Sequence, residues 1–323
     1  MPILLDEHDV RQLLPMADLI DAMEGALAAF STGKVRQPVR SVVDLPAGGF
    51  FAVMPAALVS PAAAGAKLVT VVAANHARGL PSHLATIVLL DAETGALEAI
   101  VDGRYITEAR TAAVSAVSAR HLARKDSQVV AIIGSGVQAR SHADALSRVL
   151  TLREFRVWSP AQPHRERGAR EIESATGVAT SASPSPRDAV EGADIVVLVT
   201  SATEPVVEDA WIEPSAHIIA VGACRPAHRE MPAALVSRAH LVVDSRDAAM
   251  QEAGDILLAR SEGVTVTIAA ELGEICAGTA KGRGSSTGVT IFKSLGLAVE
   301  DLVAAELVAR RAKATGVGRT FSF

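Results

Sequence analysis

The chain of 323 residues is poor in aromatic and cysteine residues and has no excess of positive charge. Only two Trp, one Tyr and seven Phe are present, and 36 acidic against 31 basic side chains give a formal net charge of −5. A nucleic-acid-binding protein would be expected to show a basic patch and stacking rings, so the composition argues against a nucleic-acid partner. The two cysteines, Cys224 and Cys276, are too few for a disulfide framework and have no neighbouring cysteine with which to form a metal site.

The sequence also lacks a long apolar run and a metal-binding histidine motif. The nine histidines include no HExxH and no other closely spaced ligand pair, so no metal site is expected. The first residues lack the basic and apolar regions of a signal peptide, and the Ala-rich stretch 56–74 carries Lys67 near its middle. We therefore expect a soluble, cytoplasmic protein without a membrane partner, with one or two domains.

Small and aliphatic residues are abundant instead, and their spacing predicts both helices and strands. In the N-terminal part, apolar side chains at 20, 23, 27 and 30 follow the period of a helix, and Gly33 is placed to end it. The apolar runs 85–90 and 96–101 flank a turn-rich segment, which is typical of a β-hairpin.

From about residue 128 the pattern changes to that of a parallel sheet. Short apolar runs alternate with helix-compatible segments, at 129–133, 155–158, 195–199, 217–221 and 241–243. Continuous apolar strands separated by helices indicate a sheet covered on both faces. The Ser- and Pro-rich stretch 181–186 is expected to be a loop. A final helix is expected at 299–314, and because it follows the parallel-sheet region, we expect it to return to the N-terminal domain.

A glycine-rich loop follows the first of these strands. Gly134-Ser135-Gly136-Val137-Gln138-Ala139 fits the pattern G-x-G-x-x-A between a buried strand and a helix. The first glycine permits a tight turn, the second lets the backbone approach a pyrophosphate, and Ala139 allows close helix packing. Free backbone N–H groups at the helix N-terminus would then face the phosphates. The loop predicts dinucleotide binding, against the simpler interpretation of a strand–helix turn without a ligand.

The end of the next strand bears on the choice of coenzyme. An NAD-dependent enzyme usually places Asp or Glu there for the ribose hydroxyls, whereas Trp158-Ser159-Pro160 is followed by no carboxylate before Glu166. Arg165 and Arg167 are close in the sequence and could meet a 2′-phosphate. The pattern favours NADPH slightly over NADH, although an Arg-Glu-Arg run is also typical of a solvated helix face.

Three cations in the N-terminal part lie at unexpected positions. Arg40 precedes an apolar strand, while Lys67 and Arg110 each lie inside a largely apolar segment. A charge inside an apolar run is costly unless it is paired or faces a cavity. Because few acids stand beside them in the sequence, we expect the three cations to form a site for a carboxylate-bearing substrate. Taken singly, each also fits a surface or ion-paired residue.

Motifs along nearly the whole chain resemble those of the ornithine cyclodeaminase/mu-crystallin family, and most of all its mu-crystallin-like ketimine reductases. The matching stretches are 37–40, 53–56, 67–70, 81–83, 110–113, 134–139, 202–205 and 292–296. The resemblance implies an α/β fold in which a Rossmann-type, doubly wound sheet (119–296) is inserted into a discontinuous α+β domain. That domain, 1–118 plus 297–323, would bind substrate and form a homodimer.

The resemblance also implies roles for individual residues. Arg40, Lys67 and Arg110 would line the substrate pocket and act in catalysis. Met54 and Cys224 are candidate pocket-wall residues, although Met54 also fits an ordinary core position. The residues implied to meet the cofactor are Ser82, His83, Arg110, Thr111, Gly134, Ser135, Gly136, Val137, Gln138, Ser159, Thr200 and Val221.

Two positions depart from the family pattern. Cyclodeaminases and the family's alanine dehydrogenases carry an Asp six residues before a Glu, where this chain has Cys224 and Glu230. Mu-crystallin-like members have Ser-Arg-Pro there, which Cys224-Arg225-Pro226 mirrors. Pro160 stands where NADPH-dependent relatives often have Arg, and a proline side chain cannot donate to a 2′-phosphate.

We therefore expect an NAD(P)H-dependent reductase of a small cyclic ketimine such as Δ1-pyrroline-2-carboxylate or Δ1-piperideine-2-carboxylate. A protonated C=N is already electrophilic, so a site that holds it in line needs no strong general acid. Arg40 and Arg110 would grip the carboxylate, and Lys67 would either bind it or relay a proton. The alternatives are ornithine cyclodeaminase or alanine dehydrogenase activity and, in another class, a non-enzymatic ligand-binding protein like mu-crystallin.

Overall fold

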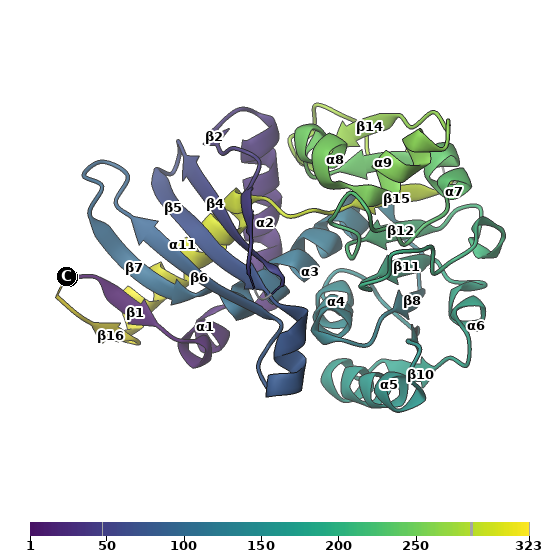
Figure 1. Ribbon diagram of the computed structural model, residues 1–323, viewed down its shortest axis with the longest axis horizontal. Coiled ribbons are helices and arrows are strands. Elements are labelled where there is room, and N and C mark those ends of the chain that lie inside the picture. The colour runs from purple at the N-terminus through teal and green to yellow at the C-terminus, as the bar shows by residue number, and fades with distance from the viewer. Residues whose placement is uncertain (47, 285–286, 323) are drawn as a thin grey trace. The chain divides into compact units, whose positions relative to one another are not determined.

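The computed structural model describes residues 1–46, 48–284 and 287–322. The chain divides into two compact units, each with its own sheet (Figure 1). The first unit comprises Met1–Arg110 and Gly296–Phe323, and the second comprises Thr111–Leu295. The division after Arg110 lies inside α3 (Gly103–Leu122), the same helix that contains the expected division after residue 118.

The first unit contains an eight-stranded, mostly antiparallel sheet in which only β1 and β7 pair in parallel, among the residues that the structure describes. Its strands, in spatial order, are β16 (Arg319–Thr320), β1 (Ile3–Leu5), β7 (Leu97–Asp102), β6 (His83–Leu90), β5 (Ala63–Val71), β4 (Phe50–Leu58) and β2 (Val35–Arg36), with β3 (Ser41–Asp44) also paired to β4. The short 3-10 helix η1 (Ala73–Arg78) joins β5 to β6. The antiparallel pair β6–β7 confirms the predicted hairpin.

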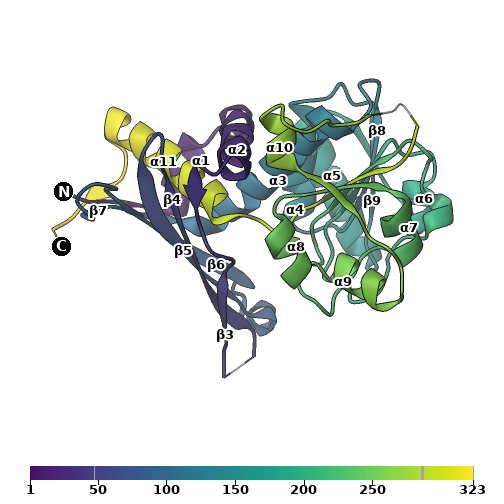
Figure 2. The ribbon, with the colours of Figure 1, turned by 90° about the horizontal axis from the view of Figure 1, so that it is seen from above.

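Helices cover one face of this sheet. Figure 2 shows α1 (Glu7–Leu13), α2 (Met16–Ser31) and α11 (Ala298–Thr315) on the same side of it. The C-terminal helix α11 packs on β4, β5 and β6 and against α2, so the last segment of the chain completes the core of the first unit. Both α2 and α11 were predicted from the spacing of their apolar residues, and α11 ends before Gly316, which has a left-handed backbone.

The second unit is a Rossmann-type α/β fold. All eight strands of its sheet are parallel, in the order β10-β9-β8-β11-β12-β15-β13-β14. Their bounds are β8 (Val129–Ile133), β9 (Glu154–Trp158), β10 (Ala179–Ala182), β11 (Ile195–Leu198), β12 (His217–Ala220), β13 (His240–Val243), β14 (Ile268–Glu271) and β15 (Thr290–Lys293). In chain order, β9 and β10 are added on one side of β8, and β11 and β12 are then added on its other side. This reversal creates the switch point at which such sheets bind dinucleotides.

Helices lie on both faces of this parallel sheet, as the buried apolar strands predicted. They are α4 (Val137–Ser147), α5 (Gln162–Thr176), α6 (Pro186–Val190), α7 (Ala233–Arg238), α8 (Arg246–Glu252), α9 (Gly254–Ser261), α10 (Leu272–Cys276) and the 3-10 helix η2 (Asp209–Trp211). Figure 1 shows α4 and α6 on opposite sides of the strands. Among the described residues, no helix is long and apolar enough to cross a membrane.

One local prediction was wrong. The stretch 181–186 was expected to be a loop, but its first two residues belong to β10, and Pro186 begins α6. The strand β10 lies at the edge of the sheet, and its residues alternate between exposed and half-buried positions. Small polar residues suffice in such a strand, so it lacks the apolar run that marks the central ones.

Candidate functional site

A buried ion pair centres on Lys67 in the first unit. The register β4–β5–β6 places Lys67 beside Met54 and Ile87 on one face of the sheet. Only 2% of Lys67 is exposed, and its Nζ lies 2.6 Å from Oδ2 of Asp301, which is itself 1% exposed. The same ammonium donates to Oγ1 of Thr107 at 3.4 Å.

Arg110 joins this pair from α3. Its Nε donates to Oδ1 of Asp301 at 3.1 Å, and its Nη1 donates to Oε2 of Glu300 at 2.6 Å. Asp301 therefore bridges Arg110 and Lys67 with its two carboxylate oxygens. Both acids lie in the first turn of α11, so the C-terminal helix supplies the anions of the cluster.

Gly296 connects this cluster to the third predicted cation. Nη2 of Arg40 donates to the carbonyl oxygen of Gly296 at 3.3 Å. The φ angle of Gly296 is +87°, and a Cβ there would meet the guanidinium of Arg110, with Nη2 only 2.7 Å away. Glycine is needed both for the left-handed backbone and for the close approach of Arg110. The structure thus brings together Arg40, Lys67 and Arg110, the three cations singled out in the sequence.

The acids that pair with these cations were not found in the sequence, because they are not sequence neighbours. Glu300 and Asp301 are far along the chain and come to Lys67 and Arg110 only through the fold. Two adjacent acids at the start of an apolar helix were a usable signal, but such acids also occur on solvated first turns because they favour the helix dipole. The five side chains of the cluster (Arg40, Lys67, Arg110, Glu300 and Asp301) carry three positive and two negative charges, which leaves one positive charge.

The electrostatics of the cluster follow from burial and close charges. Burial lowers the pKa of Lys67 to about 8, with Asp301 opposing this shift and Arg110 adding to it. Burial acts to raise the pKa of Asp301, but the charges of Arg110 and Lys67 outweigh it, so the pKa is lowered and the carboxylate is ionised. His83, at the start of β6, has its pKa lowered to about 4 by burial and by Lys67 and Arg110, so its ring is neutral at pH 7.

The glycine loop of the second unit has the geometry of a phosphate-binding turn. Gly134 follows β8 with a φ of +126°, and a Cβ there would lie 2.7 Å from the carbonyl oxygen of Val199. Gly136 is the N-cap of α4, and a Cβ there would meet no protein atom within 4 Å. Packing within the protein therefore requires a glycine at 134. It does not require one at 136, where the missing side chain leaves open space beside the N-terminus of α4. These residues fit a dinucleotide pyrophosphate.

The loop is tied to the end of β9. Oγ of Ser135 donates to Oγ of Ser159 at 2.9 Å, which brings two predicted cofactor residues together. Arg165 donates through Nη1 to the carbonyl oxygen of Ser159 at 3.1 Å, whereas Arg167 is an exposed partner of Glu171 on α5. Only Arg165 of the two candidate arginines is therefore held at the end of the strand.

Thr200 and Gly222 follow β11 and β12 at the same carboxyl edge of the sheet. Glu230 accepts from N and Oγ1 of Thr200 at 2.7 and 2.8 Å, and from N of Gly222 at 2.7 Å. Glu230 is fully buried. The family motif located it in the sequence, but it was not predicted as a site residue, since an acid in a loop gives no signal of burial. Val221 directly precedes Gly222, and its backbone N–H donates to the carbonyl oxygen of Leu198 at 2.9 Å.

The remaining predicted residues occupy varied environments. Met54 is buried in β4, whereas the side chain of Cys224 is exposed on the loop after Gly222. Ser82 precedes β6, and its carbonyl oxygen accepts from N of Val72 at 2.7 Å. Thr111 opens the second unit within α3, where its carbonyl oxygen accepts from Oγ of Ser115 at 3.0 Å.

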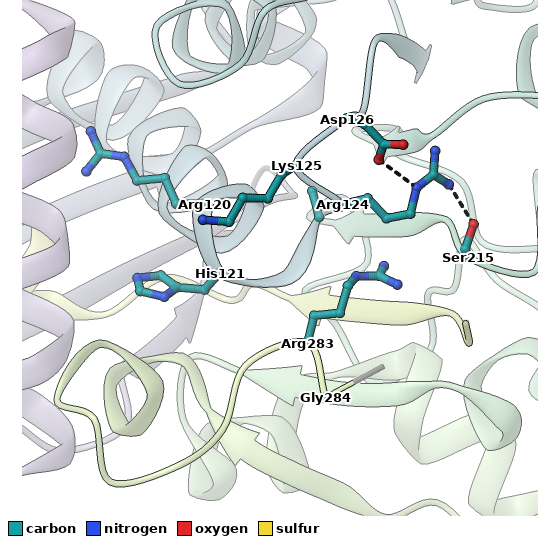
Figure 3. A pocket seen from close by; sticks show the side chains of 9 residues that line it. Arg120, His121, Arg124, Lys125, Asp126, Ser215, Arg283 and Gly284 are labelled. Atoms are coloured by element: carbon teal, nitrogen blue, oxygen red, sulfur yellow. Dashed lines mark hydrogen bonds and ion pairs between the residues drawn. The ribbon is translucent and has the colours of Figure 1, made fainter. Parts of the chain in front are cut away.

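A basic hollow of about 650 Å³ lies elsewhere in the second unit, lined by residues that precede β8, β12 and β15 (Figure 3). Arg124 points toward Asp126 and Ser215, and Arg283 donates to the carbonyl oxygen of Leu122 at the end of α3. These arginines connect α3 to the amino ends of the strands. Dinucleotides bind at the carboxyl ends of such strands, so the hollow is not part of the candidate site.

Comparison with known proteins gives matches over both units. The chain matches the ornithine cyclodeaminase/mu-crystallin family over residues 1–316. It is 42% identical over 312 residues to the ketimine reductase mu-crystallin of Rattus norvegicus, a match that covers 95% of this chain and 96% of that protein.

Two solved structures have the same fold throughout. The Δ1-pyrroline-2-carboxylate reductase of Thermococcus litoralis, in complex with NADH and L-proline, superposes with a TM-score of 0.96 and 38% identity over 99% of this chain and 100% of that one. An archaeal alanine dehydrogenase dimer with bound NAD gives a TM-score of 0.93 and 33% identity over 100% and 99% of the two chains.

Proposed function

The chain belongs to the ornithine cyclodeaminase/mu-crystallin family, and from this premise we propose that it reduces a small cyclic ketimine carboxylate with NAD(P)H. The substrate would be Δ1-pyrroline-2-carboxylate or Δ1-piperideine-2-carboxylate, and the product L-proline or L-pipecolate. The sequence of a ketimine reductase and the structure of a pyrroline-2-carboxylate reductase both match over nearly the full chain, which supports this reaction class.

The observation that carries the proposal is the buried cluster around Asp301. Its one excess positive charge matches the single carboxylate of either imine. Arg40 and Arg110 both present guanidinium groups at Gly296, one to its carbonyl oxygen and the other beside its Cα, an arrangement suited to binding a carboxylate. Glu300 and Asp301 hold the Arg110 guanidinium in place, so little side-chain entropy remains to be lost on binding.

Lys67 is suited to supply the proton that the reduction consumes. Addition of a hydride to the C=N carbon leaves a ring nitrogen that must carry a proton, unless the imine binds already protonated. With a pKa of about 8, the Lys67 ammonium is a better donor at neutral pH than an ordinary lysine. Asp301 holds its Nζ on the buried face of the sheet. The neutral ring of His83 adds no further charge to compete for the carboxylate.

A bound nicotinamide would supply the hydride. In our proposal the turn at Gly134 and Gly136 and the N-terminus of α4 hold the pyrophosphate, and Ser159 borders the adenosine end. Thr200 and Val221, on the adjoining loops, border the nicotinamide end. Further contacts are proposed for Ser82, His83, Arg110, Thr111, Ser135, Val137 and Gln138. Met54 and Cys224 are proposed as walls of the substrate site.

For the coenzyme we propose a slight preference for NADPH. No Asp or Glu lies between Trp158 and Arg165 to accept the ribose hydroxyls, and Arg165 is fixed beside the end of β9. Its guanidinium could pair with a 2′-phosphate. Two matching structures contain NADH or NAD, so NADH is the alternative coenzyme.

We also propose that the protein is a homodimer formed through the uncovered face of the first sheet. Cross-strand pairing places Val43, Phe51 and Leu84 in one row of this face, and Val53 and Leu68 in the next. Val43, Leu68 and Leu84 are exposed, and the other two are half-buried. Thr70 and Thr86 lie in the same two rows, so the face is largely but not wholly apolar. A largely apolar exposed sheet face is typical of a subunit interface, and the matching alanine dehydrogenase is a dimer.

Alanine dehydrogenase activity is the second candidate, because one matching structure has that name. The exposed thiol of Cys224 stands where such enzymes carry Asp, which disfavours both this activity and cyclodeamination. A purely ligand-binding protein is disfavoured because proteins named as reductases and dehydrogenases match over nearly the full chain.

A substrate panel tests the proposal. The purified chain is incubated with each imine and NADH or NADPH, with pyruvate, ammonia and NADH, and with L-ornithine and NAD. We expect L-proline or L-pipecolate from the imines, at rates at least about tenfold above those of the other two mixtures. Ammonia release from ornithine, or faster NADH loss with pyruvate, would replace the proposal by the corresponding alternative.

A further inference from the structure

Glu230 is the centre of a buried polar network at the carboxyl edge of the second sheet. Its Oε1 accepts two hydrogen bonds from Thr200, and its Oε2 accepts one from the backbone N–H of Gly222. One carboxylate therefore fixes the loops that follow two neighbouring strands, β11 and β12. Neither loop contains a regular element at this point, so beyond the bond from the N–H of Val221 to the carbonyl oxygen of Leu198, it is Glu230 that joins them.

The network is anchored deeper in the unit. The backbone N–H groups of Glu230 and Met231 donate to Oδ1 of Asp255 at 2.7 and 3.1 Å. Oδ2 of Asp255 lies 3.2 Å from Nζ of Lys293, at the end of β15, and both side chains are essentially fully buried. Glu230 is thus attached through Asp255 to a third strand of the same sheet.

Two glycines allow the close packing that this network requires. A Cβ at Gly222 would overlap the carbonyl oxygen of Thr200, and its distance to Cδ of Glu230 would be only 2.7 Å. A Cβ at Gly254, the first residue of α9, would overlap the carbonyl oxygens of Arg225 and His228. The segment from Gly222 to Glu230 is therefore held at both ends and along its length.

The hydrogen that the hydroxyl of Thr200 can donate is used within the protein. Its Oγ1 donates to Glu230 and accepts from the backbone N–H of Ala202 at 3.1 Å. Thr200 therefore has no hydroxyl or backbone N–H hydrogen left to donate to a coenzyme, and would contact one through its methyl group, a remaining oxygen lone pair or its main chain. The position of that main chain depends on Glu230.

We propose that Glu230 is the positioning residue for the nicotinamide end of the coenzyme, acting through Thr200 and the Gly222 loop. This inference rests on the proposed function only in assigning Thr200 and Val221 to the coenzyme. Burial raises the pKa of Glu230, with Lys293 opposing and Asp255 adding to this shift. In this proposal the network fixes the loops that follow β11 and β12 in the coenzyme-free protein, so that they need not rearrange when the coenzyme binds.

The substitution Glu230→Gln tests the proposal with almost no change in shape. A carboxamide has one acceptor oxygen, so its NH₂ group must face the N–H of either Thr200 or Gly222, and one buried donor loses its partner. We expect the dissociation constant for NADH, measured by the fluorescence of the bound coenzyme, to rise roughly tenfold. In the coenzyme-free protein, hydrogen exchange at the amides of Thr200 and Gly222 should accelerate selectively.

Asp194→Asn is the matched control. Asp194 likewise accepts from two backbone N–H groups, those of Gln128 and Val129 at 2.8 and 2.9 Å, but at the amino end of β8 in the same unit. This variant should lose stability and yet bind NADH within about twofold of the wild type.

Unchanged NADH binding in Glu230→Gln, or equal weakening in both variants, would overturn the positioning role. A wild-type chain that binds neither coenzyme would also overturn it. A wild type that binds NADH but reduces no imine would refute the proposed substrate and leave the role of Glu230 intact.

Discussion

The ammonium of Lys67 lies 2.6 Å from the carboxylate of Asp301, and both side chains are almost completely buried. One residue comes from an inner strand of the first sheet and the other from the C-terminal helix that covers it. The proposed chemistry of Lys67 therefore depends on the packing of the C-terminal helix α11 against the first sheet.

The pH dependence of imine reduction tests the role of this pair. If the ammonium form of Lys67 donates the proton, kcat/KM should fall as the pH rises through about 8, the lowered pKa of this group. Asp301 favours the charged form of Lys67, so Asp301→Asn should move this alkaline limb to lower pH by about one unit or more. The measurement is the pH profile of kcat/KM for both proteins. If the alkaline limb lies at the same pH in the wild type and in Asp301→Asn, the titrating group is the substrate or a residue other than Lys67.

The second prediction concerns Gly296. A Cβ at this position would displace the guanidinium of Arg110, so Gly296→Ala should weaken the grip on the substrate carboxylate and raise KM for the imine roughly tenfold. Gly95→Ala is the control, because Gly95 also has a positive φ of +73°, but a Cβ there would meet no atom within 4 Å. Steady-state kinetics of the two variants check this, and equal KM values would contradict the role given to Gly296.

The apolar strands and the glycine loop of the second unit were predictable for a physical reason. A strand buried on both faces needs an unbroken apolar run, such as 129–133, and a phosphate-binding turn needs glycines at fixed positions. Lys67 and Arg110 could be selected because their charge interrupts such apolar segments. The resemblance to a family added the assignment of the remaining positions.

Asp301 and Glu230 could not be selected in this way. Asp301 stands in the first turn of a helix, and Glu230 in a loop, where acids usually meet water. Their burial and their partners arise only when segments distant in the sequence come together. The edge strand β10 was missed for a related reason, since an exposed strand needs no apolar run.

The third prediction concerns coenzyme choice. Arg165→Ala should lower the ratio of kcat/KM for NADPH to that for NADH by roughly tenfold, the loss of one charge-assisted contact to a 2′-phosphate. Arg167→Ala should leave the ratio unchanged, because Arg167 is exposed and pairs with Glu171. Both ratios come from initial rates with each coenzyme. An Arg165→Ala ratio equal to that of the wild type would remove the reason to favour NADPH.

The fourth prediction concerns assembly. Leu68→Glu places a charge in the centre of the uncovered sheet face, on the opposite side of the strand from Lys67, and should convert a dimer to a monomer. Light scattering after gel filtration measures the mass. Met250→Glu is the control, since Met250 is 38% exposed, as Leu68 is, but lies on α8 in the second unit and not on this sheet. A wild-type mass of one chain, 33.4 kDa, would contradict the proposed dimer directly.

The central claim is that the cation cluster and the dinucleotide loop together reduce a cyclic imine carboxylate. The most direct measurement follows the absorbance of NAD(P)H at its nicotinamide band in the presence of Δ1-pyrroline-2-carboxylate, with L-proline quantified in the same samples. We predict one L-proline formed for each coenzyme oxidised by the wild type, and oxidation slower by about a hundredfold or more in Lys67→Met, with coenzyme binding retained. No oxidation above background with this imine or its six-membered analogue, with either coenzyme, would contradict the account.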